Sequence, residues 1–446
     1  LQIRLHVLVA DNKKFEVKTA IADSLSAPGG LELLYKFIDG TSADTASSLA
    51  FLASSIKDVG AFEQCAELYC RALEKRPELS AAALNAAHSY EGLAWVGKAF
   101  STLVTFMERN SKLTVNGLSC QTILEILKPI DIQKLDQKGH PAWPDPFLAP
   151  GDAGDILPPD PKMSYDDDQL DLLATLFTIP KLLYIMGYIR FVPVLFDLLD
   201  SLRGKRDIHL TTIRNENAYL SEIGMLGKYQ IEHPLPSPED WKLPPIYLLG
   251  DSHTLSCGWR PVIYEGKRHL LRPYLTTGIK IWHLREDSRF YPKRCFWSTA
   301  ENIPKGSTVI TLLGEIDCRE GIISAVEKGE YESLEDGARE TVGIFLNVLE
   351  RLQKEFEFKI LVHPPVPVLN ETRHIVRVFD SVLREAIMSH SSKTLRWLDF
   401  VDSLVTPDWK SLKPEYSLDG THLNPRYVDD LLSPAIQAVS SSSQQL

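Results

Sequence analysis

The sequence has no apolar run long enough to suggest a membrane span. An uninterrupted stretch of about 18 or more apolar residues would favour a transmembrane helix, and none occurs among the 446 residues. The nearest candidate, residues 170–199, contains two prolines and several charged residues, namely Asp171, Lys181, Arg190 and Asp197. We therefore expect packed helices in this segment and predict no membrane span.

Cysteine is scarce, and its spacing lacks the pairs that disulfide frameworks and zinc sites require. No CxxC motif or His-rich cluster occurs around the six cysteines, which are Cys65, Cys70, Cys120, Cys257, Cys295 and Cys318. We expect reduced thiols in a cytoplasmic protein, with neither a metal nor a cofactor. Because the chain begins at Leu1, we also expect a fragment or a processed chain, and any upstream targeting segment would lie outside this sequence.

Basic residues are not in excess. The 48 Lys and Arg residues are outnumbered by 59 Asp and Glu residues, which gives a formal net charge of −11 at pH 7. A general nucleic-acid-binding protein would present a basic face, so we predict no nucleic-acid partner. An apolar content of 44% and a charged content of 24% are ordinary for a globular protein. The length is sufficient for two or three domains.

Residues 1–135 have the pattern of paired helices. One apolar helical face in residues 46–56 is followed by Gly60, and a second in residues 65–72 is followed by Pro77. This pattern recurs at the 34-residue length of a tetratricopeptide repeat, an interval that separates Ile56, Cys65 and Ala72 from Tyr90, Ala99 and Phe106. The region thus resembles such repeats, which offer a concave surface to a protein partner. The alternative is a plain pair of helical hairpins with coincidental spacing.

Proline marks two boundaries in the middle of the chain. Residues 136–168 are rich in proline, which favours a linker or a crossing loop over a helix. Residues 169–233 are expected to be helical again and to pack on the first helices, with Asp168 as a cap and a break at Pro180. A second proline cluster at 234–238 is expected to precede a final domain at 243–437 and a disordered tail at 438–446.

The final domain alternates between strand and helix patterns. Apolar runs predict strands at 245–249, 278–283, 307–313, 358–363 and 395–400, with amphipathic helices between the later runs. This alternation favours an α/β fold with a mainly parallel sheet covered on both faces. His363 ends one of these strands, where it would either line a pocket or form part of a rigid turn.

Two short motifs in this domain supply a serine, a histidine and an acid. The strand predicted at 245–249 runs into the sequence GDSH, which places Ser252 at the carboxyl edge of the sheet, where open α/β folds hold their ligands. Far downstream, Asp419 precedes His422 by one short turn. A serine nucleophile needs a base within reach and an acid that orients the base. The alternative is that the first motif is only a turn and the second only a helix cap.

The order of these motifs, GDS early and DxxH late, resembles the SGNH, or GDSL-type, hydrolase family over about residues 243–437. The resemblance implies a three-layer, flavodoxin-like parallel sheet, here preceded by the all-α repeat-like domain. It also implies that Ser252 is the nucleophile, His422 the general base and Asp419 the acid that orients the base. Gly278 is the best match to the family's oxyanion-hole glycine. The family's third block is G-x-N-D, and this chain has Ile316 where the Asn would be.

The residues beside these motifs have two interpretations each. Arg319 could replace the missing Asn or bind an anionic group of the substrate, or it could form a structural ion-pair cluster with Glu315 and Asp317. Asp251 could hold the turn before Ser252 by bonding to the backbone. His253 could contact substrate or be a buried histidine bonded to the backbone. We expect no metal in this loop because it offers no His or Cys partner at ligand spacing.

These features predict a serine ester hydrolase that acts through an acyl-enzyme. A small or sugar-linked ester is the expected substrate, because no long apolar stretch suggests a lipid tunnel. One alternative is an acyltransferase, in which an acceptor hydroxyl replaces water after the same covalent step. Another is a catalytically degenerate domain within a scaffold whose helical region binds a protein.

Overall fold

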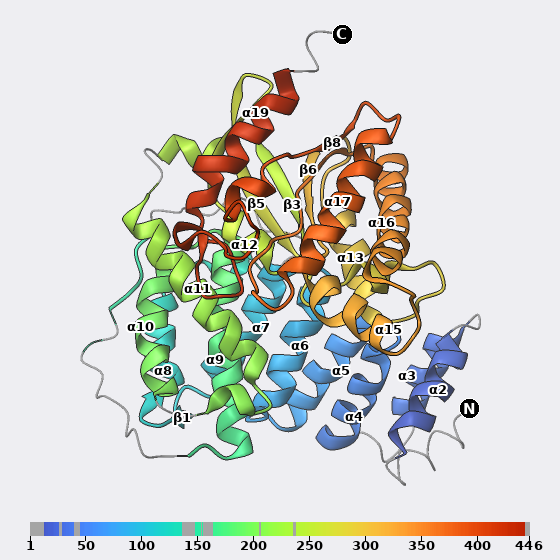
Figure 1. Cartoon of the computed structure of the whole chain (residues 1–446). Helices are drawn as coiled ribbons and strands as arrows, with labels where there is room; N and C mark the ends of the chain where they lie inside the picture. Colours follow the sequence, from blue (N-terminus) through green and yellow to red (C-terminus); the bar gives the residue numbers. More distant parts are fainter. Residues whose placement is uncertain are drawn as a thin grey trace. The chain divides into compact units, whose positions relative to one another are not determined.

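The computed structural model describes residues 13–25, 29–39, 45–135, 148–152, 154, 164–204, 207–234 and 238–441 (Figure 1). The chain divides into two compact units. The first consists of Leu1–Leu220 with Arg289–Cys295, and the second of Ser221–Ser288 with Phe296–Leu446. The predicted linker at 136–168 lies largely outside the described residues, as do residues 235–237 of the second proline cluster.

The division between the units differs from the predicted boundary at 234–243. It falls inside helix α11 (Arg214–Glu232), and the short segment Arg289–Cys295 belongs to the first unit. Helix α11 continues through residue 220 without a break, so no proline or glycine cluster marks this position in the sequence. The unit that carries Ser252 and His422 therefore begins within a helix, upstream of the proline cluster.

The first unit is almost entirely helical. Its helices α4 (Ala46–Lys57), α5 (Phe62–Lys75), α6 (Ser80–Gly92) and α7 (Val96–Arg109) pack against one another in chain order. The remaining described elements are α2 (Lys14–Leu25), α3 (Gly30–Asp39), β1 (Thr114–Val115), β2 (Leu118–Ser119), α8 (Cys120–Leu127), η1 (Ile132–Lys134), α9 (Asp167–Met186), α10 (Phe191–Arg203), η2 (Ile208–Leu210) and the first part of α11. The helices predicted in residues 46–79 are confirmed as α4 and α5, with Gly60 between them and Pro77 after α5.

Helix α9 is the one described helix that is long and apolar enough to cross a membrane, and 89% of its apolar window is buried inside the protein. Its cap is Asp166 rather than the predicted Asp168, because the Asp166 carboxylate accepts the backbone N–H of Gln169 at 2.8 Å. The helix also continues through Pro180, where the sequence predicted a break. Burial of nearly every residue from 170 to 186 offsets the hydrogen bond that Pro180 cannot donate.

The second unit contains a six-stranded, mostly parallel sheet in the order β4-β5-β3-β6-β7-β8. The strands are β3 (Pro245–Gly250), β4 (Pro261–Tyr264), β5 (Lys267–Leu275), β6 (Thr308–Leu312), β7 (Lys359–Val362) and β8 (Leu395–Trp397). Only the β4–β5 pair is antiparallel among these strands. The chain passes from β3 to β5 on one side of β3 and then to β6 on the other side. The carboxyl end of β3 is therefore the point at which the strand order reverses.

Apolar clusters cover both faces of this sheet. On one face, side chains of β3, β6 and β7 pack against α13 (Tyr291–Glu301), α16 (Leu334–Phe356) and α17 (Arg373–Ser389). On the other face, they pack against α12 (His253–Cys257), α18 (Val401–Leu404), η7 (Val428–Leu432) and α19 (Ser433–Ser441). Figure 1 shows α16 and α17 on one side of the strands and α19 on the other. The predicted parallel sheet with helices on both faces is confirmed at this level.

Four of the five predicted strands are present, and one is wrong. Residues 278–283 form a turn and the start of the 3₁₀ helix η4 (Ile281–Leu284), whereas the neighbour of β3 is β5. Pro273 and several charged residues obscured β5 in the sequence. Leu270 and Thr276 donate their N–H groups to the carbonyl oxygens of Pro244 and Gly250. By the alternation of a strand, Pro273 points its nitrogen away from β3, where it removes no ladder bond.

Residues 438–441 are helical, although the sequence predicted a disordered tail at 438–446. They form the last turn of α19, whose buried residues Ala435, Ile436 and Ser440 hold the helix against the unit. Residues 442–446 lie outside the described residues. The serine-rich composition of this segment favoured a disordered tail, so its short apolar helical face was not predicted.

Gly250 provides a test of the packing at the end of β3. A Cβ atom at this position would overlap the carbonyl oxygen of Leu312 in β6. We expect Gly250→Ala to lower the free energy of unfolding by about 1 to 3 kcal/mol, as overpacking does elsewhere, measured by guanidinium unfolding. The matched control is Gly343→Ala in α16, where a Cβ meets open space and alanine should stabilise by about 0.5 to 1 kcal/mol. Equal effects of the two substitutions would contradict this packing.

Candidate functional site

Ser252 lies just beyond the carboxyl end of β3, immediately before α12. The close approach of β3 to β6 excludes a side chain at Gly250, and Asp251 donates its N–H to the carbonyl oxygen of Leu312 at 3.4 Å. The Thr254 hydroxyl bonds to the carbonyl oxygen of Asp251 at 2.7 Å and closes the turn. These contacts hold the Ser252 side chain, which is half-buried, at the reversal of the strand order.

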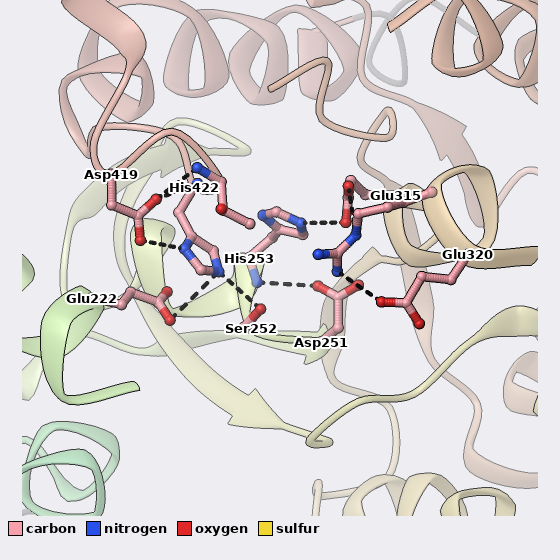
Figure 2. A network of polar contacts seen from close by, with 10 residues as sticks. Glu222, Asp251, Ser252, His253, Glu315, Glu320, Asp419 and His422 are labelled. Atoms are coloured by element: carbon pink, nitrogen blue, oxygen red, sulfur yellow. Dashed lines mark hydrogen bonds and ion pairs between the residues drawn. The ribbon is translucent and has the colours of Figure 1, made fainter. Parts of the chain in front are cut away.

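Ser252, His422 and Asp419 form a connected series of hydrogen bonds (Figure 2). Ser252 Oγ is 3.0 Å from His422 Nε2, and His422 Nδ1 is 2.8 Å from Asp419 Oδ2. The other carboxylate oxygen, Asp419 Oδ1, accepts the N–H groups of Thr421 at 2.8 Å and His422 at 2.7 Å. Gly420 has a φ of 86°, which suits glycine and allows this tight turn. The structure thus brings together the three residues that the two motifs predicted.

The electrostatics of this series stabilise a charged His422. Burial would raise the pKa of Asp419, but the hydrogen bonds from His422 and the backbone outweigh burial and lower the pKa to about 2. Burial would likewise lower the pKa of His422, but the charges of Glu222 and Asp419 and the hydrogen bond to Asp419 raise it to about 9. Asp419 Oδ2 accepts a hydrogen bond from the Nδ1–H group of His422, so Nε2 is the ring atom available to Ser252.

Glu222 is a fourth member of the site that the sequence analysis missed. Its side chain is about 1% exposed, and its Oε2 lies 3.5 Å from His422 Nε2. Burial is the main reason that the pKa of Glu222 is raised to about 7, although His422 lowers it. One signal was available: Leu220, Ile223 and Leu226 recur at three-residue intervals in α11 and are buried, and Glu222 lies four residues before Leu226 on the same side of the helix. A Glu within an apolar helical stripe indicates a buried partner.

Asp251 and His253 connect Ser252 to the loop after β6. Asp251 is buried and its Oδ1 accepts the N–H of His253 at 3.1 Å, which confirms its predicted bond to neighbouring backbone. The ring of His253 is buried, as one interpretation expected, but it bonds through Nε2 to Glu315 Oε2 at 3.3 Å rather than to the backbone. The rings of His253 and His422 lie side by side, with centroids 5.0 Å apart.

The acidic residues after β6 have separate partners. Glu315 lies 3.4 Å from Arg319 Nε, an ion-pair distance without hydrogen-bond alignment, and Arg319 Nη2 is 3.8 Å from Glu320. Asp317 does not join this cluster, because its carboxylate accepts the N–H groups of Ile281 at 2.8 Å and Trp282 at 3.0 Å. The ion-pair interpretation therefore holds for Glu315 and Arg319 but not for Asp317. No group of His, Cys, Asp and Glu suited to a metal ion occurs within the described ranges.

Asp317 thereby ties the loop after β6 to the loop after β5. That second loop carries Gly278, which is exposed, has a φ of 64° and precedes η4. Burial raises the pKa of Asp317 to about 6, against the two backbone donors that favour its charged form. Ile316, one residue earlier, is 8% exposed. Gly278 and Ile316 thus lie in loops at the same end of the sheet as Ser252.

A cavity of about 200 Å³ adjoins these two loops. Its lining includes Lys280, Trp282, His283, Asp317, Glu320 and Tyr331. Arg285 stacks on the ring of Trp282 at 3.7 Å, and Lys280 pairs with Glu320 at 3.0 Å. The cavity therefore combines aromatic surface with paired charges.

His363 belongs to a buried structural network. Its Nδ1 is 2.6 Å from the carbonyl oxygen of Pro364, and its Nε2 is 3.1 Å from the hydroxyl of Tyr427. The same hydroxyl lies 2.5 Å from Cys257 Sγ. Burial lowers the pKa of His363 to about 3, so the ring is neutral. Of the two interpretations of His363, the structure favours the rigid turn.

The depressed pKa of Asp419 predicts a pH-dependent contribution to stability. Because the folded-state pKa lies about two units below the ordinary value, the ionised carboxylate contributes about 2 kcal/mol near pH 7. That contribution is present above the ordinary pKa near 4 and is lost as the pH falls toward 2. Guanidinium unfolding should show a deficit in Asp419→Asn that is largest near neutral pH and shrinks between about pH 4 and pH 2. A deficit that stays constant across this range would argue against the ionised pair.

Comparisons with protein-family models, with curated proteins and with solved structures find no match for this chain. The roles of the site residues therefore follow from their contacts. Those contacts place one serine and two carboxylates around the imidazole ring of His422.

Proposed function

We propose that the second unit is a serine ester hydrolase that acts through an acyl-enzyme on a small or sugar-linked ester. The observation that carries this proposal is the hydrogen-bonded series in which Ser252 Oγ lies 3.0 Å from His422 Nε2 and His422 Nδ1 lies 2.8 Å from Asp419. These are the distances that a base needs to remove a hydroxyl proton. The depth of Ser252, half-buried at the sheet edge, suits an ester that reaches it from solvent.

In the proposed reaction, the neutral ring of His422 accepts the Ser252 proton as Oγ attacks the ester carbonyl carbon. Asp419 keeps the other ring proton on Nδ1 and stabilises the imidazolium that forms. His422 then gives the proton to the departing alcohol, which leaves an acyl group on Ser252. Water attacks this acyl group with His422 again as the base, and the acid product leaves. An acyltransferase would follow the same steps with an acceptor hydroxyl in place of that water.

The fold supports assignment to the SGNH type. The five parallel strands follow the order β5-β3-β6-β7-β8, which is the flavodoxin-like order 2-1-3-4-5 when the strands are numbered along the chain. Ser252 follows the first of these strands, at the reversal where such sheets bind ligands. The oxyanion would be stabilised by the N–H groups of Ser252 and Gly278. We assign the protein to the cytoplasm on its cysteine usage alone.

A second candidate function is a degenerate SGNH-like domain within a protein-binding scaffold. It is favoured by Ile316, whose buried apolar side chain stands where the family presents an amide donor. Arg319 is also held by Glu315 and Glu320, which limits its use as a substitute donor. In this case the packed helices α4 to α7 would act as tetratricopeptide-like repeats that bind a protein partner.

Labelling with a serine-directed fluorophosphonate separates the two candidates. We expect the 446-residue chain to form a covalent adduct at Ser252 and to hydrolyse a small aryl acetate. Ser252→Ala and His422→Ala should each abolish turnover, and the double variant should be hardly slower than either single variant, because coupled catalytic residues are not additive. Intact-protein mass spectrometry detects the adduct. Absence of both labelling and hydrolysis would leave the scaffold function.

Replacement of Ile316 tests the oxyanion hole. If hydrolysis proceeds with backbone donors alone, Ile316→Asn should raise kcat by up to about tenfold, a part of the roughly 10²- to 10³-fold effect of such a donor. Ile316→Val is the matched control and should leave kcat unchanged. Guanidinium unfolding of both variants shows whether the buried amide destabilises the unit. If Ile316→Asn folds well but its kcat does not rise, the oxyanion does not form beside residue 316.

A further inference from the structure

Glu222 and Ser252 face the same nitrogen of His422. Glu222 Oε2 is 3.5 Å from Nε2, and Ser252 Oγ is 3.0 Å from it (Figure 2). Nε2 carries either a proton or a lone pair. Ser252 needs the lone pair for its own activation, whereas an ionised Glu222 is attracted to the proton and repelled by the lone pair. The two side chains therefore favour opposite protonation states of His422.

The surroundings of this pair favour the protonated state. Asp419 holds Nδ1 from the far side of the ring at 2.8 Å. Asp251 adds a third nearby acid that acts on both His422 and Glu222, while His253 acts on Glu222 in the opposite sense. His253 is itself paired with Glu315, which in turn faces Arg319. His422 thus lies among more acidic than basic groups.

The carboxylate of Glu222 has few polar partners besides His422. Its Oε1 is buried and makes no hydrogen bond with the described residues. A buried carboxylate without donors is costly, so the His422 proton is its available source of stabilisation. Burial lowers the pKa of His422, but the charge of Glu222 is the first of the effects that outweigh burial and raise it to about 9. In return the charge of His422 lowers the pKa of Glu222, which burial raises to about 7.

We propose that Glu222 is a positioning residue that holds a proton on His422 Nε2, so that the base of Ser252 is idle until this proton passes to solvent. This inference rests on the proposed hydrolase function. Once the proton has left, His422 accepts the Ser252 proton, and the imidazolium that forms is again stabilised by Glu222. Glu222 therefore makes His422 a stronger base but leaves a smaller fraction of it free near neutral pH.

Titration of His422 in the 446-residue chain tests the inference without relying on turnover. The protein is labelled with ¹³C at the histidine Cε1 positions, and the His422 signal among the 12 histidines is identified by its loss in His422→Gln. We expect a wild-type midpoint near pH 9 and a midpoint lower by about one unit or more in Glu222→Gln, a change of about tenfold in proton affinity. Equal midpoints in the two proteins would overturn the inference.

The pH profile of aryl acetate hydrolysis supplies the second readout. In Glu222→Gln the acidic limb of kcat/KM should move to lower pH together with the His422 midpoint, while the alkaline plateau falls because the base is weaker. The two profiles should therefore cross, with the variant faster near neutral pH. Background hydrolysis is subtracted with Ser252→Ala. An unshifted acidic limb with a uniform loss at every pH would reduce Glu222 to a structural role and overturn the inference.

Two further variants keep the result interpretable. Glu232→Gln removes the same charge from an exposed position near the end of α11 and should change neither the midpoint nor the limb. Glu222→Met keeps the volume without the carboxylate and should reproduce the shift of Glu222→Gln if the amide variant folds poorly. If neither labelling nor hydrolysis occurs while the His422 midpoint still shifts, the hydrolase function fails and the proton-holding contact stands. If hydrolysis occurs and the His422 midpoint does not shift, the hydrolase function stands and the proton-holding role of Glu222 fails.

Discussion

The buried imidazole of His422 has to satisfy two ring nitrogens and a positive charge with little help from water. Asp419 bonds to Nδ1, Ser252 bonds to Nε2, and Glu222 faces Nε2 as well. Removal of any partner leaves a buried polar group, which costs free energy. Because the partners come from the end of β3, the turn before η7 and the middle of α11, this one ring joins three segments that are distant in the sequence, all within the second unit.

Buried carboxylates extend this constraint across the sheet edge. Asp251 holds the backbone of His253, and Glu315 holds the ring of the same residue. Asp317 accepts two backbone N–H groups from the start of η4. The loops after β3, β5 and β6 are thus joined by hydrogen bonds rather than by apolar packing alone. A buried polar group without a partner is costly, so the bonds from Asp251, Glu315 and Asp317 favour this arrangement of the three loops around Ser252.

The same arrangement connects the basicity of His422 with the fraction of its rings that are unprotonated. In the proposed hydrolase, each carboxylate beside His422 would stabilise the imidazolium that forms during proton transfer, and the same carboxylates would keep that imidazolium present before substrate binds. Asp419 acts on the nitrogen that Ser252 does not use, so it orients the ring without competition. Glu222 acts on the nitrogen that Ser252 does use. A site with both acids therefore differs chemically from a simple serine, histidine and acid triad.

Patterns along the chain predicted much of the fold. Alternating apolar runs located β3, β6, β7 and β8, and helical faces located α4, α5, α16 and α17, because each pattern depends on burial within one segment. Strand β5 was not predicted, because Pro273 and its charged neighbours have the composition of a loop. Its place beside β3 is acceptable only because the proline nitrogen points away from the β3 ladder. The division of the chain inside α11 was hidden for a similar reason, since an unbroken helix carries no boundary signal.

The sequence by itself determined the candidate residues: the order of GDSH and DGTH was sufficient to select Ser252, Asp419 and His422 for the proposed chemistry, and these three side chains do meet. Only the tertiary structure decided that Glu222 faces His422, that Asp317 holds the backbone of η4, and that His253 bonds to Glu315. Spacing within a segment reports which side of a helix or strand a residue occupies. It does not report which distant segment covers that side, because that depends on how buried charges and apolar faces are satisfied together when the chain folds.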